Sequence, residues 1–423
     1  MRRHPGGSGR KGHQGDSLTA VKSLLISGAY FPPQTGGISR YMASICATLG
    51  REEICCLTGV RLNNGNRERE GWPRVYRRPA AFAKAWHAQA PSLALALIQI
   101  LLRERPGVVQ IATTHDGSIG LWLRRRFGLP YMVYAHGNEI LGATQSEWEK
   151  PRQSLLQASR VLAVSRFTAS LVANTGVSPE RIEIVHPGCD VDSFRPHQPG
   201  SALRERLLGK RRGQSIILSV GNLVSRKGHD MVIRALARLS GSTRELTYLI
   251  VGDGPYRSAL EELASALGVR DQVVFAGKLA EEELPDAYAL CDLFVLTSRE
   301  QLESCDVEGF GMVFLEANAS GKPVVAGRSG GIGDAVVDQE TGLLVDPLDP
   351  ASIAAAVERL LMNHELALRM GELGRERAVR EFSWPVVAAR IRKILRQVAQ
   401  EDSRNAALPA ESGPRGGPTP IPS

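Results

Sequence analysis

The sequence predicts an α/β protein made of two Rossmann-like, doubly wound domains that face each other across a cleft. The chain has 423 residues, of which 43% are hydrophobic, and this length is enough to bury two cores. Short apolar runs alternate with longer helical patterns, which is typical of parallel sheets flanked by helices. This scheme runs through the chain twice, with a proline-containing stretch between the two passes.

The first domain is expected over residues 19–190. Its strands are expected at residues 24–27, 54–57, 108–112, 131–134, 161–164 and 182–185, and two of its helices at 38–49 and 167–174. Residues 191–213 have few apolar side chains and are interpreted as the linker.

The second domain is expected over residues 214–383. Its strands are expected at 216–220, 247–251, 273–275, 293–296, 323–326 and 342–345, and its helices at 231–239, 256–267, 310–319 and 352–361. A final amphipathic helix over 384–400 carries Val386, Ile391, Ile394 and Leu395 on the face that should pack against the protein. Residues 1–18 and 402–423 are rich in Gly, Pro, Ser and charge, and are expected to be disordered.

Composition argues against several classes of protein. The longest apolar run, residues 92–102, is shorter than the ~20 residues that a membrane span needs. A signal peptide is the alternative for residues 24–26, but the run is short and leads into a glycine turn, as a first strand would. The six cysteines have no metal-ligand spacing and are sparse for a secreted scaffold, so a reducing cytoplasm is expected.

The net charge of +8 suggests a partner of opposite charge. Basic residues occur in the first tail and at the expected ends of elements, without the interleaved aromatics that stack bases, so no nucleic-acid partner is expected. An anionic donor or an anionic membrane surface is the better partner. Residues 81–105 form an apolar segment flanked by Arg103 and Arg105, and either it rests on such a membrane or its apolar positions pack on the first sheet.

The most informative segment joins Glu308 to Glu316 through a Gly-Phe-Gly turn and a helix start. Free backbone N–H groups at a helix start, with glycines that permit close approach, make a cradle for an anion or for hydroxyl groups. The alternative is that Glu308 caps the helix and Glu316 is a solvated side chain.

Two loops that follow first strands add to this pattern. Arg226 and Lys227 lie in the loop after the strand at 216–220, where a forked donor and a compact charge can hold a diphosphate. Gly36 and Gly37 follow the strand at 24–27, but they lack the spacing of dinucleotide-binding enzymes. Either loop, taken alone, can also be an ordinary surface turn.

His136 ends the strand at 131–134, and a polar side chain at that end of a strand faces the ligand crevice. A lone histidine is as often structural. Asp190 and Asp192 resemble a metal-binding pair, but they follow a proline at the expected linker, so we expect neither a metal nor another cofactor.

Taken together, these motifs resemble the family 4 glycosyltransferases of the GT-B fold, over nearly the whole chain from Leu24 to the final helix. The resemblance implies a retaining hexosyl transfer from a nucleotide sugar, with the leaving phosphate accepting the acceptor's proton. It implies that Glu308 contacts the donor sugar near the reacting carbon, that Glu316 binds the ribose and that His136 lies against the sugar. Arg226 and Lys227 would grip the diphosphate, with Gly36 and Gly37 near donor phosphate and acceptor, and backbone cradling the donor at Phe310, Gly311, Met312 and Val313.

Donor and acceptor stay open at this point. The segment around Glu308 is similar to those of bacterial phosphatidylinositol mannoside and polysaccharide mannosyltransferases, which implies GDP-mannose against a UDP-hexose, and a lipid-linked or saccharide acceptor. Many relatives carry arginine where this chain has Asn222, which makes the role of Arg226 less secure than that of Lys227. The alternatives are a nucleotide-sugar epimerase or phosphorylase on the same architecture, and a non-catalytic sugar-binding protein.

Overall fold

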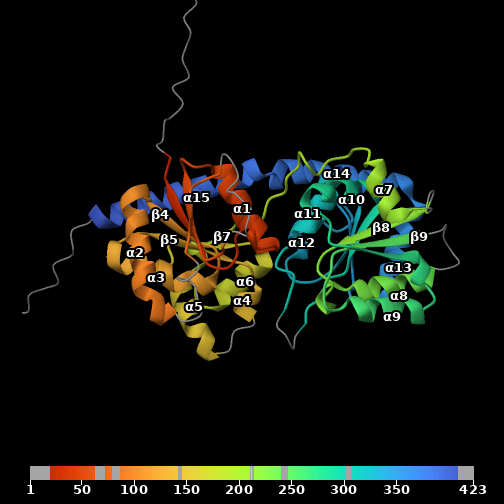
Figure 1. Ribbon diagram of the computed structural model, residues 1–423, viewed down its shortest axis with the longest axis horizontal. Helices are drawn as coiled ribbons and strands as arrows, with labels where there is room; N and C mark the ends of the chain where they lie inside the picture. Colours follow the sequence, from red (N-terminus) through yellow and green to blue (C-terminus); the bar gives the residue numbers. More distant parts are fainter. Residues whose placement is uncertain are drawn as a thin grey trace, which may run out of the picture.

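The computed structural model describes residues 20–61, 72–78, 86–141, 145–209, 211, 214–239, 246–301 and 306–407. The first predicted tail, 1–18, residues 408–423 of the second predicted tail, and residues 81–85 of the apolar segment lie outside this range. Two units, each a sheet between helices, lie side by side (Figure 1).

The N-terminal unit contains a seven-stranded parallel sheet in the order β3-β2-β1-β4-β5-β6-β7. Its strands are β1 Ser23–Ser27, β2 Ile54–Thr58, β3 Val75–Arg77, β4 Val108–Ile111, β5 Tyr131–Ala135, β6 Arg160–Ala163 and β7 Ile182–Ile184. All six predicted strands are present. The sequence analysis missed β3, because this edge strand has only three residues and none of them is fully buried.

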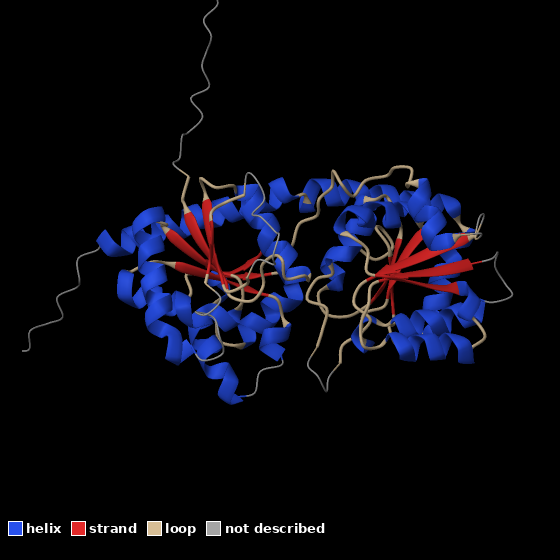
Figure 2. Cartoon of the chain, viewed as in Figure 1, coloured by secondary structure: helices blue, strands red, loops and turns tan. Residues whose placement is uncertain are grey.

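The helices of this unit cover both faces of its sheet (Figure 2). They are α1 Gly37–Leu49, α2 Trp86–Glu104, α3 Gly117–Phe127, α4 Asn138–Leu141, α5 Gln145–Gln157 and α6 Arg166–Asn174. The segment that was predicted to be apolar forms most of α2. Its side chains divide between Leu93, Leu97 and Ile100, which are buried under the sheet, and Leu95 and Leu102, which are exposed.

The C-terminal unit repeats the scheme with a six-stranded parallel sheet in the order β10-β9-β8-β11-β12-β13. Its strands are β8 Ser215–Val220, β9 Leu246–Val251, β10 Val273–Gly277, β11 Leu293–Leu296, β12 Val324–Gly327 and β13 Leu343–Val345. Its helices are α8 His229–Leu239, α9 Arg257–Ala266, α10 Leu284–Leu290, α11 Met312–Ala319, α12 Ile332–Ala335 and α13 Pro350–Met362. In both units the first strand in sequence is an inner strand, between β2 and β4 in one sheet and between β9 and β11 in the other. This is the point where the strand order reverses, and Rossmann-like units bind their ligand in the crevice beyond it.

The segment predicted as a linker, 191–213, is more than a connection. It contains the helix α7, Ser201–Leu208, which buries Leu203, Leu207 and Leu208 against the C-terminal unit. These three leucines are spaced as on one face of a helix, which is the pattern that predicts an amphipathic helix. The sequence analysis missed this helix because it considered only the low apolar content of the whole segment.

Two long helices end the described chain, α14 His364–Phe382 and α15 Trp384–Ala407. Helix α14 packs on α11, and α15 returns to pack on α1 and β4 of the N-terminal unit. Helix α15 continues into residues 402–407, which were predicted to belong to a disordered tail. It also exposes Val386 and buries Val387 instead, so the predicted packing face was rotated by one residue at its start.

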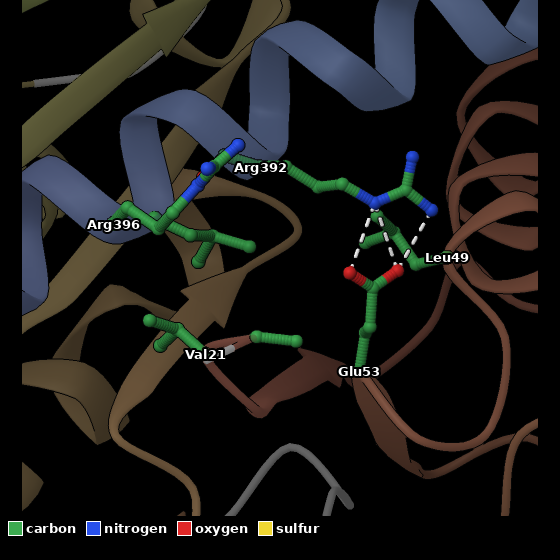
Figure 3. Close-up of a pocket in the computed structure, with 7 residues that line it drawn as sticks. Val21, Leu49, Glu53, Arg392 and Arg396 are labelled. Carbon is green, nitrogen blue, oxygen red and sulfur yellow. Dashed lines mark hydrogen bonds and ion pairs between the residues drawn. The ribbon is translucent and has the colours of Figure 1, made fainter. Parts of the chain in front are cut away.

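An ion pair fixes α15 to the N-terminal unit. The guanidinium of Arg392 donates to both carboxylate oxygens of Glu53, with its Nε 2.9 and 2.8 Å from them. A small pocket of about 140 Å³ lies beside this pair, lined also by Val21, Leu49 and Arg396 (Figure 3). Because Val21 and Glu53 precede β1 and β2, this pocket lies at the amino edge of the sheet, opposite the edge where a Rossmann-like unit binds its ligand.

None of the described helices is long and apolar enough to cross a membrane.

Candidate active site

The loops at the carboxyl ends of both sheets converge on a cluster of charged side chains. Arg226 and Lys227 lie in a short 3-10 turn, Ser225–Lys227, that follows β8, while Asp306 and Glu308 lie in the loop between β11 and α11. Lys227 Nζ is 2.5 Å from Glu308 Oε2, and Arg226 bridges the two carboxylates at 2.9 Å from Glu308 and 2.8 Å from Asp306. The structure therefore brings together the three residues Glu308, Arg226 and Lys227 that the sequence analysis selected from separate motifs.

This cluster keeps Glu308 ionised. Its side chain is only 14% exposed. Burial by itself raises the pKa of this carboxyl, but the charges of Lys227 and Arg226 outweigh burial and bring the pKa down to about 2. Glu308 is therefore a fixed negative charge at neutral pH and has no proton to give to a substrate.

A second ion pair, between Arg299 and Asp230, supports the turn Ser225–Lys227, and the sequence analysis missed it. Arg299 donates to Asp230 at 3.0 Å and to the hydroxyl of Ser225 at 2.9 Å, and its backbone N–H donates to the carbonyl of Arg226 at 2.9 Å. Arg299 thus ties the end of β11 to the turn that carries Arg226 and Lys227. No local pattern marks this contact, because Arg299 and Asp230 are 69 positions apart.

The helix that follows Glu308 begins later than predicted. Gly311 takes a left-handed conformation, with φ 94°, and α11 starts at Met312 rather than at Phe310. Among the described residues, none accepts a hydrogen bond from the backbone N–H of Met312 or of Val313. These amides are available to an anion or to hydroxyl groups at the helix start.

The side chain of Phe310 does not face this cradle. It is buried and stacks on the ring of His186, with ring centroids 5.2 Å apart. His186 Nδ1 bonds to the carbonyl of Val164, and burial lowers the pKa of this histidine. Phe310 therefore anchors the loop to the N-terminal unit, and only its backbone can serve a ligand.

Glu316 is buried, which overturns the alternative that it is a solvated helix side chain. Its carboxylate forms an ion pair with Arg40 of α1, and its second oxygen accepts a hydrogen bond from Tyr288 at 2.7 Å. Arg40 comes from the opposite unit, and nothing in the sequence linked it to Glu316.

His136 lies at the boundary between the two units. Its ring Nε2 is 2.9 Å from the carbonyl of Ala112, and its backbone N–H donates to Glu139. Its carbonyl packs against Gly309 so closely that a Cβ at position 309 would come within 2.2 Å of it. His136 therefore lies next to the loop that carries Glu308, at the carboxyl edge of its own sheet, as predicted.

Gly36 and Gly37 differ from the other predicted residues because the space where a side chain would extend is open at both. Both are exposed, at the amino end of α1, and a Cβ at either position would meet no atom within 4 Å. Asn222 is also exposed, at the start of the loop after β8. These three residues remain open to a ligand.

Further polar contacts hold the two units together at the site. The Asn138 side chain donates to Asp306 at 2.5 Å and accepts from the backbone N–H of Val307 at 3.0 Å. On the other side of the site, Arg166 of α6 pairs with Asp334 of α12 at 2.6 Å. The sequence analysis did not identify these contacts, since each joins residues about 170 positions apart.

The pair Asp190 and Asp192 stabilises the local backbone at the start of the predicted linker. Asp190 accepts hydrogen bonds from the N–H groups of Asp192 and Ser193 and from the Ser193 hydroxyl. The described residues contain no group of three His, Cys, Asp or Glu that could hold a metal ion.

Comparison with known proteins identifies the family of this chain. Residues 35–193 match the family described as Glycosyltransferase Family 4, and residues 204–377 match Glycosyl transferases group 1. A GDP-mannose-dependent alpha-(1-6)-phosphatidylinositol monomannoside mannosyltransferase of Mycolicibacterium smegmatis is 34% identical over 389 residues, which cover 88% of this chain and 98% of that protein. This chain belongs to the family 4 glycosyltransferases. The protein of the same description from Mycobacterium tuberculosis is 32% identical and covers 89% of this chain and 98% of its own length.

The solved structures agree on the fold of this glycosyltransferase. Anabaena Alr3699/HepE in complex with UDP and glucose superposes with a TM-score of 0.74 at 20% identity, over 89% of this chain and all of that one. The two Rossmann-like units and their order thus form the GT-B fold. The protein is a hexosyltransferase, and its fixed cations, ionised carboxylate and free helix-start amides meet at the carboxyl edges of both sheets.

Proposed function

We propose that this glycosyltransferase moves mannose from GDP-mannose to a phosphatidylinositol mannoside, with retention of the anomeric configuration. The observation that carries the proposal is the similarity to the mannosyltransferase of M. smegmatis, which extends over 98% of that protein and includes both units. In this chain the same region holds the cluster of Arg226, Lys227 and Glu308.

The charges of the cluster suggest how the donor binds. Two cations, Arg226 and Lys227, are balanced by two carboxylates, Asp306 and Glu308. A diphosphate competes for the cations through its own charged oxygens, since Arg and Lys bind phosphate as readily as carboxylate. Once the cations turn to the diphosphate, Glu308 keeps its negative charge and can face the sugar.

The same arrangement suits the reaction. Negative charge develops on the leaving diphosphate, where Arg226, Lys227 and the amides of Met312 and Val313 stabilise it, while positive charge develops on the sugar beside Glu308. The leaving phosphate accepts the acceptor's proton on the face from which it departs, which gives retention without a protein nucleophile. Gly311 and Phe310 supply backbone to the same cradle, and His136 lies against the sugar.

Nucleotide binding distinguishes the proposed donor from a UDP-sugar, the alternative. The purified protein would be incubated with GDP, UDP, GDP-mannose and UDP-glucose, and its thermal unfolding recorded. We expect stabilisation by the guanine nucleotides only, because binding to the native state raises the unfolding temperature. Stabilisation by UDP and UDP-glucose alone would replace GDP-mannose with a UDP-hexose. Release of GDP only when the acceptor is present would separate a transferase from an epimerase.

A lipid acceptor fits the exposed face of α2. Leu95, Ile98 and Leu102 are exposed there at helical spacing, with Leu95 and Leu102 at 59% and 73%. The same unit carries exposed arginines, Arg103 on α2 and Arg125 and Arg126 on α3, and apolar residues of both helices belong to one core cluster. Apolar side chains beside cations suit an anionic bilayer surface, so we place the enzyme peripherally at the inner face of the membrane.

Liposome sedimentation tests this contact. We expect binding to anionic vesicles, weaker binding to neutral ones, and loss of binding as salt rises, because surface charges are screened over about 8 Å at physiological ionic strength. Replacement of Leu95 and Leu102 by Ser should weaken binding, while the same change at the exposed Leu368 of α14 should not. Equal binding to both kinds of vesicle would remove the electrostatic part of the proposal.

We also propose that catalysis needs no metal. Full activity after EDTA treatment is expected. A strict requirement for added Mn or Mg would contradict it.

A further inference from the structure

The carboxylate of Glu316 is occupied from two directions. Tyr288 donates to Oε2, and Arg40 pairs with Oε1. The side chain of Glu316 is only 3% exposed, so water cannot take the place of either partner without opening the structure. Because so little of the side chain is accessible, a ligand can reach the Glu316 carboxylate only where one of these two groups moves aside.

The two partners differ in how easily they can leave. Tyr288 is fully buried and packs between Phe194 and Phe294. Arg40 belongs to the other unit, its side chain is 33% exposed, and it lies in the first turn of α1 beside the open Gly36 and Gly37. Arg40 is therefore the exchangeable partner, and Tyr288 is the fixed one.

We propose that Arg40 occupies the position of the nucleotide ribose on Glu316 in the free enzyme and yields it when the donor binds. This inference rests on the proposed function and on the role that the family resemblance implies for Glu316, which is to bind the ribose of the nucleotide sugar. Arg40 then determines how strongly the site selects an intact ribose diol, because every diol that reaches Glu316 must first replace a charged hydrogen-bond donor.

The exchange has a consequence for affinity. In the free enzyme the Arg40 guanidinium satisfies Glu316, and the binding energy of the diol is reduced by the energy of that ion pair. Without Arg40, the carboxylate keeps only Tyr288 and is left partly unsatisfied in a buried place. A diol then gains the whole interaction, so nucleotides with the diol should bind more tightly and nucleotides without it should not.

The test compares GDP with 2′,3′-dideoxy-GDP by calorimetric titration. In Arg40→Ala we expect the preference for GDP over the dideoxy analogue to rise about tenfold relative to the unmodified enzyme, since a hydrogen bond to a charged group has this magnitude. Arg40→Lys keeps the charge without the fork and should fall between the two. Arg51→Ala, an exposed arginine of the same unit, serves as the control and should leave the preference unchanged.

Glu316→Gln provides a second, independent variant. It should reduce the preference for the diol and make that preference insensitive to Arg40→Ala. The reason is that Arg40 and the diol compete for the Glu316 carboxylate, which this variant replaces with an amide. Circular dichroism and thermal unfolding of each variant confirm that it is folded before titration.

The outcomes separate this inference from the proposed function. If the unmodified enzyme binds neither GDP nor UDP, the proposed function and the exchange at Glu316 are both overturned. If it binds UDP alone, UDP and 2′,3′-dideoxy-UDP replace the two guanine nucleotides in the same test. If the enzyme binds its nucleotide but Arg40→Ala leaves the preference unchanged, or weakens both ligands equally, the exchange at Glu316 is wrong and the proposed function stands.

Discussion

The two units place equivalent loops at the carboxyl edges of their sheets but build them in opposite ways. After β1, Gly36 and Gly37 stand exposed, and nothing lies within 4 Å of a Cβ at either position. After β8, the corresponding loop is packed: a Cβ at Gly228 would lie 2.1 Å from the carbonyl of Thr297, and Arg299 bonds to Ser225 and to the backbone of Arg226. The loop after β8 is therefore held in place by contacts within the protein, whereas the loop after β1 has open space around its glycines.

This difference agrees with a division of tasks. A diphosphate has the same shape in every nucleotide sugar, so a rigid set of cations can be preorganised for it. The acceptor varies more between enzymes, and an open loop on a similar scaffold accommodates that variation. The predictions that follow test whether the packed loop and the open loop really differ in this way.

The largest effect is expected from the charges on the packed side. Lys227→Ala and Glu308→Ala should each reduce turnover by at least ~100-fold, the scale of losing one preorganised electrostatic contact. Steady-state kinetics with the matched nucleotide sugar measures this. Lys393→Ala, an exposed lysine on α15, is the control. Rates near those of the unmodified enzyme in either site variant would contradict the assignment of the site.

A second pair of variants compares the two loops directly. Gly228 has φ 73°, so Gly228→Ala combines backbone strain with the clash at Thr297 and should lower the free energy of unfolding by at least about 2 kcal/mol. Gly37→Ala has free space and should change it by less than about 0.5 kcal/mol. Urea denaturation measures both. Similar losses in the two variants would show that the loops are equally packed.

The support of the packed loop can be weakened without touching a charge that faces the ligand. Arg299→Ala removes the ties to Asp230 and Ser225 and should weaken donor binding about tenfold, with a smaller effect on kcat, because the cations remain but are less well positioned. Arg299→Lys should recover part of the affinity. A loss confined to kcat would instead place Arg299 in the chemical step.

The smallest effect concerns a carboxylate that resembles Glu308 but lies at the other edge of a sheet. Burial by itself raises the pKa of Glu104, but hydrogen bonds from Lys22, Tyr76 and Arg74 outweigh burial and bring the pKa down to about 2. A folded pKa below the unfolded value of about 4.5 stabilises the protein above pH 4.5, and this stabilisation is lost as the pH falls toward 2. Glu104→Gln should therefore be less stable at pH 7, and its difference from the unmodified protein should shrink below pH 4.5.

Activity distinguishes the two carboxylates. Glu104→Gln should retain its turnover at pH 7 and 25 °C, because Glu104 lies at the end of α2 beside the amino end of β1, away from the cleft. A large loss of turnover in a folded Glu104→Gln protein would mean that a change at the far edge of the N-terminal unit reaches the site. That result would contradict the conclusion that contacts within the C-terminal unit position the charges of the site.

The sequence by itself determined every strand of the two sheets except β3, the segment from Glu308 to Glu316 and the turn with Arg226 and Lys227. These features are local, since strand patterns extend over four to six residues and glycine turns over fewer, and such short periods can be found along the chain. Shifts of one or two residues, at the start of α11 and on the face of α15, arose where a glycine conformation or the packing partner sets the detail.

Only the tertiary structure decided which of these residues meet and which others join them. Arg40 and Glu316 are 276 positions apart, Asn138 and Asp306 are 168 apart, and Arg299 and Asp230 are 69 apart. No periodicity links such positions, because their contact depends on the sheet order within each unit and on how the two units close. The sequence therefore determined the parts of the site, and the contact between the two units determined that Glu316 is held by Arg40 of the N-terminal unit.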